Sequence, residues 1–86
     1  MSVISTFFGI IVRMFFDDHE PPHFHVEYQG QFSTFDFSGK LIAGELRSAR
    51  ARRLVREWAR LHEQELLANW TKVKALTPLQ QIAPLE

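Results

Sequence analysis

Three of the four histidines in this chain lie within seven residues of one another, at positions 19, 23 and 25. Carboxylates and two consecutive prolines accompany them in residues 17–25, which we call the His-rich turn. Imidazole and carboxylate groups bind divalent zinc, nickel, iron or manganese where no thiolate is available, and the chain has no cysteine. We therefore expect a divalent metal site formed by His19, His23, His25 and Asp18.

The same residues are also suited to acid–base catalysis without a metal. Arg13 lies on the alternate face of the preceding apolar segment, and the pattern places it near His25 and Glu27. This set suits phosphodiester cleavage, with His23 or His25 as general base and Arg13 stabilising the phosphate. Two non-catalytic interpretations stand beside this one: a metal-binding module, and a rigid polar turn whose histidines contact local backbone.

The elements that must position these residues are predicted to be strands in the first half of the chain. Segment 8–16 is rich in β-branched and aromatic residues, and segment 24–28 alternates apolar and polar side chains. Segments 32–37 and 41–46 predict two further strands, the last of them weakened by Gly44. We expect a small antiparallel sheet of three to four strands.

From Ser48 the apolar residues recur with a helical period, and Ser48 itself is suited to cap the helix. The apolar direction turns by about 100° near residues 62–64, more than the ~20° per heptad drift of a regular helix. We expect one kinked helix or two consecutive helices over 48–76, packed on one face of the sheet, and an extended tail over 77–86. The prediction is a single α+β domain of residues 1–86.

Charge is divided unevenly along the chain although its net value is zero. Residues 1–46 hold two basic against six acidic residues, a net charge of −4, and residues 47–86 hold eight against four, a net charge of +4. Arg50, Arg53, Arg56 and Arg60 belong to a basic stripe that suits either a solvated face, paired in part with the acidic half, or an acidic protein partner. Glu27 is expected, with Arg13, to join the His-rich turn in an interaction surface. Nucleic acid is not favoured, because lysine is sparse and the overall charge is zero.

Most of the eight phenylalanines fit strand interiors, and Phe15 and Phe32 are the ones expected to be exposed. Such residues mark an interface, and a homodimer would bury them. The apolar run 7–12 is too short to span a bilayer, and no basic segment precedes it. We expect a cytoplasmic protein that does not enter a membrane.

Residues 7–28 read FFGIIVRMFFDDHEPPHFHVEY, which resembles the signature of the bacterial family known as domain of unknown function 4160. Residues 57–59, 61–62 and 65–70 resemble its carboxy-terminal half. The resemblance implies a small prokaryotic cytoplasmic protein encoded beside a second small protein, an arrangement suspected to be toxin–antitoxin-like. Our leading hypothesis is an interaction protein of such a pair, with the His-rich turn as its working surface. The competing hypotheses are a metal-dependent hydrolase, a metal-free ribonuclease and a non-catalytic metal-binding module.

Overall fold

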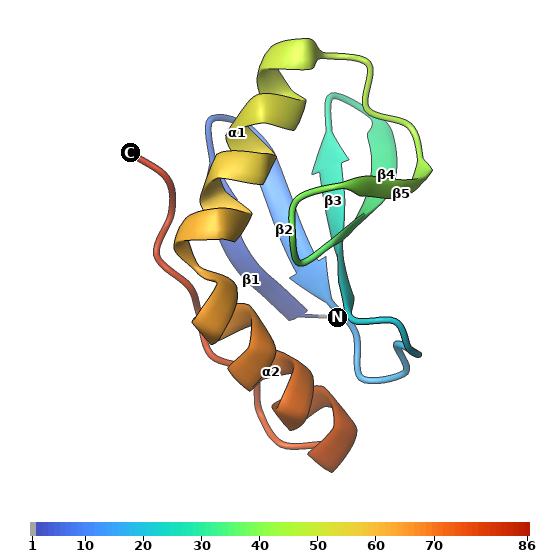
Figure 1. Cartoon of the computed structure of the whole chain (residues 1–86), viewed down its shortest axis with the longest axis vertical. Helices are drawn as coiled ribbons and strands as arrows, with labels where there is room; N and C mark the ends of the chain where they lie inside the picture. The colour runs from blue at the N-terminus through green and yellow to red at the C-terminus, as the bar shows by residue number, and fades with distance from the viewer. Residues whose placement is uncertain (1) are drawn as a thin grey trace.

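A five-stranded antiparallel sheet forms the first half of the chain in the computed structural model, which describes residues 2–86 (Figure 1). The strands are neighbours in sequence order: β1 (Ser2–Phe7), β2 (Ile10–Met14), β3 (His23–Tyr28), β4 (Gln31–Asp36) and β5 (Leu41–Gly44). Two helices follow, α1 (Ala49–Leu61) and α2 (Glu63–Ala75). The α+β prediction is confirmed, but the predicted strand number of three to four is wrong, because there are five.

The additional strand is β1, which precedes the predicted strand 8–16; that predicted segment begins with the two-residue turn after β1 and continues into β2. Phe8 and Gly9 both have positive φ, 50° and 79°, and they join β1 to β2. Positive φ at both central residues is the geometry of the two-residue turns that match the twist of paired strands. Phe8 is exposed, not part of a strand interior as predicted. A phenylalanine at this backbone position is rare, so its type conceals the turn.

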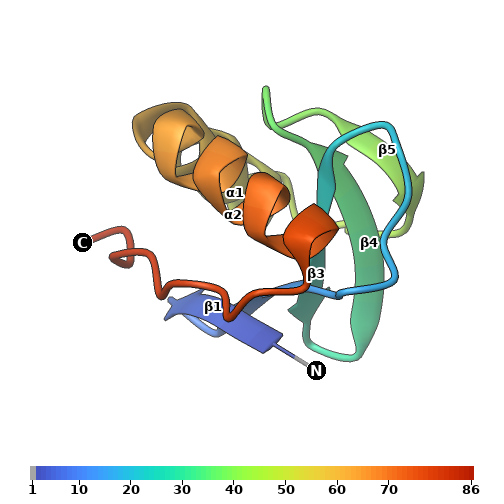
Figure 2. The same ribbon diagram turned by 90° about the horizontal axis from the view of Figure 1, so that it is seen from below.

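The core lies between one face of the sheet and the two helices. Alternate strand residues such as Ile10, Val12 and Phe24 are fully buried there against Val55 and Trp58 of α1. Figure 2 shows both helices on the same side of the sheet, which leaves the opposite face free of helices. We call this opposite side the outer face. It carries the polar residues that alternate with the buried ones along β2 and β3.

Both helix boundaries follow the sequence prediction. Ser48 caps α1, and its side chain accepts a hydrogen bond of 3.0 Å from the backbone N–H of Ala51. The helical segment breaks at His62, which ends α1 and precedes α2. Two consecutive helices therefore replace a single straight one, and the change of apolar direction is accommodated by the break.

No helix within residues 2–86 has the length and apolar character needed to cross a membrane.

The tail 77–86 has no regular structure, yet it is tied to the rest of the domain. Ile82 is buried, and its N–H donates to the carbonyl of Ile4 on β1 at 2.8 Å. The indole N–H of Trp58 donates to the carbonyl of Ala83 at 2.9 Å. Both figures of the ribbon show the tail running beside β1 (Figures 1 and 2). The tail therefore completes the core at the β1 side.

Candidate functional site

Asp18 is fixed by the turn that follows β2. Its backbone N–H donates to the carbonyl of Phe15 at 3.1 Å, and its carboxylate Oδ2 accepts from the N–H of Phe15 at 2.9 Å. A short acidic side chain that bonds to nearby backbone is a common way of closing a turn. The carboxylate is 8 % exposed. The second oxygen, Oδ1, is thereby directed toward β3.

His23 and His25 face Oδ1 of Asp18 from β3. They are two residues apart on a strand, so both lie on the outer face of the sheet. The Nε2 atom of His25 lies 3.0 Å from Oδ1, and the Nε2 atom of His23 lies 3.4 Å from the same oxygen. One donor atom of each of the three residues lies within 4.8 Å of the other two. The structure thus gathers one carboxylate oxygen and two imidazole nitrogens.

A backbone carbonyl sets the orientation of the His23 ring. Nδ1 of His23 lies 2.7 Å from the carbonyl oxygen of Pro21, which can only accept a hydrogen bond. Nδ1 therefore carries the proton, and in the neutral ring the lone pair is on Nε2, the atom near Asp18. Histidines that bind metals commonly donate their other ring N–H in this way. The carbonyl of Pro21 thus fixes the His23 ring with Nε2 directed toward Asp18.

The separations of these atoms agree with the requirements of a small divalent ion. Zinc binds imidazole nitrogen and carboxylate oxygen at about 2.0–2.2 Å, so two ligands of a tetrahedral zinc ion lie about 3.4 Å apart. The two measured separations from Asp18, 3.0 and 3.4 Å, are close to that value. Three protein ligands leave one tetrahedral position for water or a substrate. These two separations fit such an ion, and the donor atoms of the two histidines lie within 4.8 Å of each other.

The second helix holds the loop between β2 and β3 in place. The indole N–H of Trp70 on α2 donates to Oε2 of Glu20 at 3.0 Å, and Nζ of Lys74 lies 2.9 Å from the same oxygen. The hydrogen bonds from Lys74 and Trp70 lower the pKa of Glu20 below its ordinary value. The Trp70 ring also lies beside that of His23, with a centroid separation of 5.5 Å. Helix α2 therefore positions both the loop and one of the histidines.

Two of the predicted site residues lie on the outer face but outside this cluster. Arg13 pairs with Glu27 at 2.6 Å, on adjacent strands, and Arg13 is the direct cross-strand neighbour of His25. The predicted proximity of Arg13, His25 and Glu27 is therefore present.

His19 is exposed and does not join Asp18, His23 and His25, although the sequence pattern predicts it among the ligands. The chain carries His19 on the exposed side of the loop, ahead of the two prolines.

The arginine stripe forms a separate surface. Arg53, Arg56 and Arg60 are exposed and lie together on α1. Arg50 is apart from them, with its guanidinium 5.7 Å from the ring centre of Phe8. Within residues 2–86 none of these four arginines forms an ion pair. Glu27 belongs to the outer face of the sheet, so the predicted interaction residues do not form one continuous surface.

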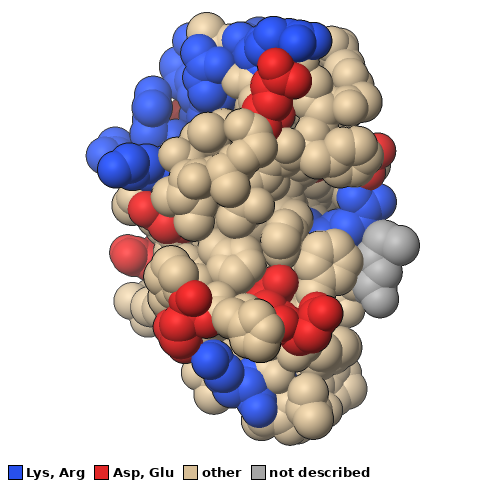
Figure 3. Space-filling model, turned by 90° about the vertical axis from the view of Figure 1, so that its right-hand side faces the viewer, with Lys and Arg blue, Asp and Glu red and all other residues tan. Residues whose placement is uncertain are grey.

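Figure 3 shows a central area without charged side chains, with acidic groups below it and several basic groups at its upper left. Acidic groups also lie near the top and at both sides of this face, and further basic groups lie at its right edge and at its bottom, so the two signs are mixed on it. The His-rich turn contributes the acidic residues 17, 18 and 20 to the chain between β2 and β3.

Residues 9–71 match the family described as Domain of unknown function (DUF4160). This range contains Asp18, His23 and His25, the break between the two helices, and most of the sheet. The chain belongs to this family. No curated protein and no solved structure matches the chain. The resemblance seen in the sequence is therefore confirmed at the level of the family, which carries no assigned activity.

Two residues beside the site, Trp70 and Pro21, have roles that the sequence pattern does not reveal. The helical period places Trp70 on the inner helix face, but its N–H also reaches Glu20, fifty residues earlier in the chain. The two prolines predict a rigid turn, but not that the carbonyl of Pro21 is the acceptor for His23. The amphipathic pattern of α2 indicates the burial of Trp70. No sequence signal marks its hydrogen-bond partner.

Proposed function

We propose that this protein binds a divalent transition-metal ion through Asp18, His23 and His25. One observation carries the proposal: a carboxylate oxygen and two imidazole nitrogens lie within 4.8 Å of one another. The carboxylate is nearly buried, and a buried charge is costly unless it is paired or binds a metal. An ion at this position would use the Oδ1 atom of Asp18, which both histidines already face.

The arrangement favours metal binding over metal-free cleavage of RNA. In a metal-free ribonuclease, His23 or His25 would take a proton from the substrate and Arg13 would contact the phosphate. Here Nε2 of His25 faces Asp18, Nδ1 of His23 faces Pro21, and Arg13 is paired with Glu27. These contacts support a fixed set of ligands. A hydrolase that uses the ion would extend the proposal, because the fourth position is left for water.

The mixed nitrogen and oxygen ligands suit zinc, nickel, iron or manganese. Elemental analysis by plasma mass spectrometry on untagged protein tests the proposal. We expect close to one ion per chain in the wild type and in His19→Ala, which removes a neighbouring exposed imidazole. We expect the ion to be lost from the His23→Ala/His25→Ala variant and from Asp18→Asn.

The outcome that contradicts the proposal is equally definite. If wild-type protein holds no stoichiometric metal after incubation with each of the four ions, the cluster is a hydrogen-bonded turn and not a metal site. Equal metal content in the wild type and the double variant would likewise place the ion elsewhere. Circular dichroism of each variant shows whether a loss of metal accompanies a loss of fold.

The remaining expectations stay predictions. We propose a bacterial, cytoplasmic protein that acts with a second small protein encoded nearby, as the resemblance implies. In that arrangement, suspected to be toxin–antitoxin-like, the metal site would belong to the working surface. A homodimer stays a prediction as well. Co-expression with the neighbouring gene product and sedimentation analysis of the purified chain test these two predictions separately.

A further inference from the structure

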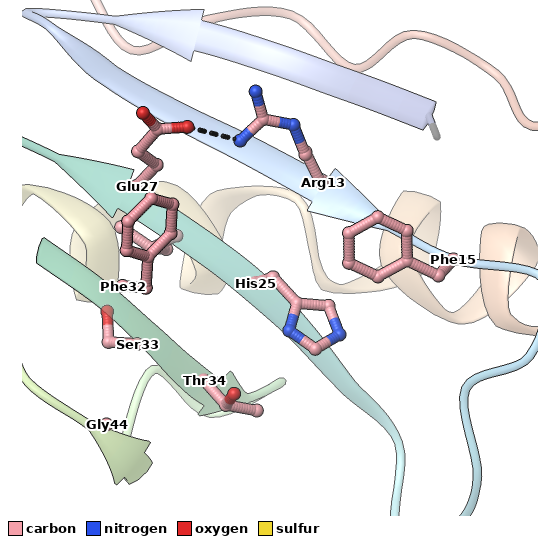
Figure 4. A pocket seen from close by; sticks show the side chains of 9 residues that line it. Arg13, Phe15, His25, Glu27, Phe32, Ser33, Thr34 and Gly44 are labelled. Carbon is pink, nitrogen blue, oxygen red and sulfur yellow. Dashed lines mark hydrogen bonds and ion pairs between the residues drawn. The ribbon is translucent and has the colours of Figure 1, made fainter. Parts of the chain in front are cut away.

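A cavity of about 460 Å³ opens on the outer face of the sheet, next to the proposed metal ligands. Its lining includes His25, the charged pair Arg13 and Glu27, and the rings of Phe15 and Phe32. Figure 4 shows His25 between the two phenylalanines, with the Arg13–Glu27 pair at one end. The volume lies within the range of roughly 300–1,000 Å³ that small-molecule sites occupy. Of the three proposed metal ligands, only His25 lines this cavity.

Phe32 is the unusual element of this cavity. It lies on the outer face of β4 and is 63 % exposed, although the opposite face of the same strand packs in the core. Phe15 is half-buried and already packs on His25, with ring centres 4.7 Å apart. An exposed ring in a cavity offers a flat apolar surface to a ligand. The ligand that uses it best is itself flat.

The Arg13–Glu27 pair adds a second requirement. Within residues 2–86, Arg13 donates one hydrogen bond, from Nη1 to Glu27, although a guanidinium carries five N–H donors. Among residues 2–86 its buried Nε has no partner. Glu27 accepts at Oε1, which leaves its Oε2 oxygen for another donor. The pair has no net charge, so it selects a ligand by adjacent donors and acceptors and not by charge.

We propose that this cavity binds a nucleobase. A base combines a flat aromatic ring with neighbouring donors and acceptors on its edge, and these match the Phe32 ring and the Arg13–Glu27 pair. The base stacks on Phe32 and presents its edge to the pair. The ring comes from a mononucleotide or from single-stranded RNA. None of these three residues, Arg13, Glu27 and Phe32, is a proposed metal ligand, so base binding does not require the metal.

Binding is tested by titrating the full-length protein with the four ribonucleoside monophosphates, followed by amide NMR shifts, and with fluorescent single-stranded RNA, followed by anisotropy. Each titration is run with a chelator and again with zinc. We expect binding in both conditions. Phe32→Ser should weaken it by roughly five- to hundredfold, which is the range for one stacked base.

Phe8→Ser is the matched control, because Phe8 is another exposed phenylalanine, on the turn between β1 and β2. It should leave the affinity unchanged, and Phe32→Trp should preserve binding. Tighter binding of RNA than of every mononucleotide identifies single-stranded RNA as the source, and the reverse identifies a free nucleotide. The proposal is overturned if neither class shifts the amides around Phe32, or if Phe32→Ser and Phe8→Ser bind equally well. Neither result affects the metal proposal.

Discussion

Trp70 on α2 and Glu20 in the loop after β2 are joined by a hydrogen bond of 3.0 Å across fifty positions of the chain. Through this bond the helical half of the domain holds the loop that carries Asp18 and leads to His23. The Trp70 ring supports His23 directly as well. The geometry of the proposed metal ligands is therefore set by both halves of the fold and not by the His-rich turn alone.

Replacing Trp70 by phenylalanine should weaken zinc binding by roughly tenfold, the lower end of the range for residues that orient ligands. Phenylalanine keeps most of the buried ring but removes the N–H that holds Glu20. A competition titration with a chromogenic zinc chelator measures the effect. Lys74→Met removes the exposed ion pair with the same carboxylate, and we expect roughly a twofold change there. A folded Trp70→Phe protein with wild-type zinc affinity would show that α2 has no positioning role.

Asn69 should be a major contributor to the attachment of the tail. Its side chain donates to the carbonyl of Gln80 and accepts from the N–H of Gln80, both at 2.9 Å. Asn69→Ala removes both bonds, and we expect a loss of about 2 kcal/mol in the free energy of unfolding. Gln80→Ala keeps the backbone groups that make these bonds and should change stability by less than about 0.5 kcal/mol. Urea denaturation of the two variants distinguishes side-chain from backbone recognition at this position.

Gly39 and Gly30 should respond differently to the same substitution. Both have positive φ, 89° and 77°, so alanine is strained at either position. At Gly39 an added Cβ would also lie 2.7 Å from Cα of Arg56, whereas at Gly30 it meets nothing within 4 Å. We expect Gly30→Ala to cost about 1 kcal/mol and Gly39→Ala roughly 3 kcal/mol. Equal costs in thermal unfolding would mean that the β4–β5 turn moves away from α1 without penalty.

Asp36 should make stability depend on pH in the acid range. Burial raises the pKa of this carboxyl. Hydrogen bonds from Ser38 and Lys40 and the charge of Lys40 lower it by a larger amount, so the net pKa is below the ordinary 3.8. A carboxyl with a depressed folded pKa stabilises the protein above its unfolded pKa, and this contribution is lost as pH falls through the folded pKa.

Asp36→Asn should therefore be less stable than the wild type at pH 7 by about 1–2 kcal/mol, because the amide oxygen lacks the charge that strengthens the three hydrogen bonds accepted by Oδ1. The difference should shrink as the pH is lowered below about 4. Denaturant titrations from pH 7 to pH 2 measure it. Asp17→Asn, at an exposed acid in the loop after β2, serves as the control and should show no such convergence. A difference that stays constant with pH would contradict the assigned role.

Local patterns in the sequence are sufficient to predict the helices and the placement of two of the proposed ligands, His23 and His25. Ser48 has a capping side chain and precedes an amphipathic run, so the start of α1 is predictable. The spacing of His23 and His25 places them on one side of a strand, and the structure has them there. In each case the determining interaction lies within a few residues, where sequence patterns carry information.

The rest depends on contacts that have no periodic pattern. The turn at Phe8 is hidden in the sequence because that residue type rarely adopts positive φ. The exclusion of His19 depends on the path of the backbone ahead of the two prolines, which residue types do not define. The Trp70–Glu20 bond joins distant side chains, and the tail is held largely through its main chain. None of these leaves a signature in the order of apolar and polar residues.

The tail that runs beside β1 also has a consequence for self-association. An outer strand of a sheet exposes unpaired carbonyl and N–H groups, which can template edge-to-edge aggregation. On β1 the carbonyls of Val3 and Ile4 already accept hydrogen bonds from Gln81 and Ile82. At the other end of the sheet β5 has four residues, too few to offer a long edge. The two edges of the sheet are thus protected in different ways. The tail occupies part of the hydrogen-bonding edge of β1, and β5 is short.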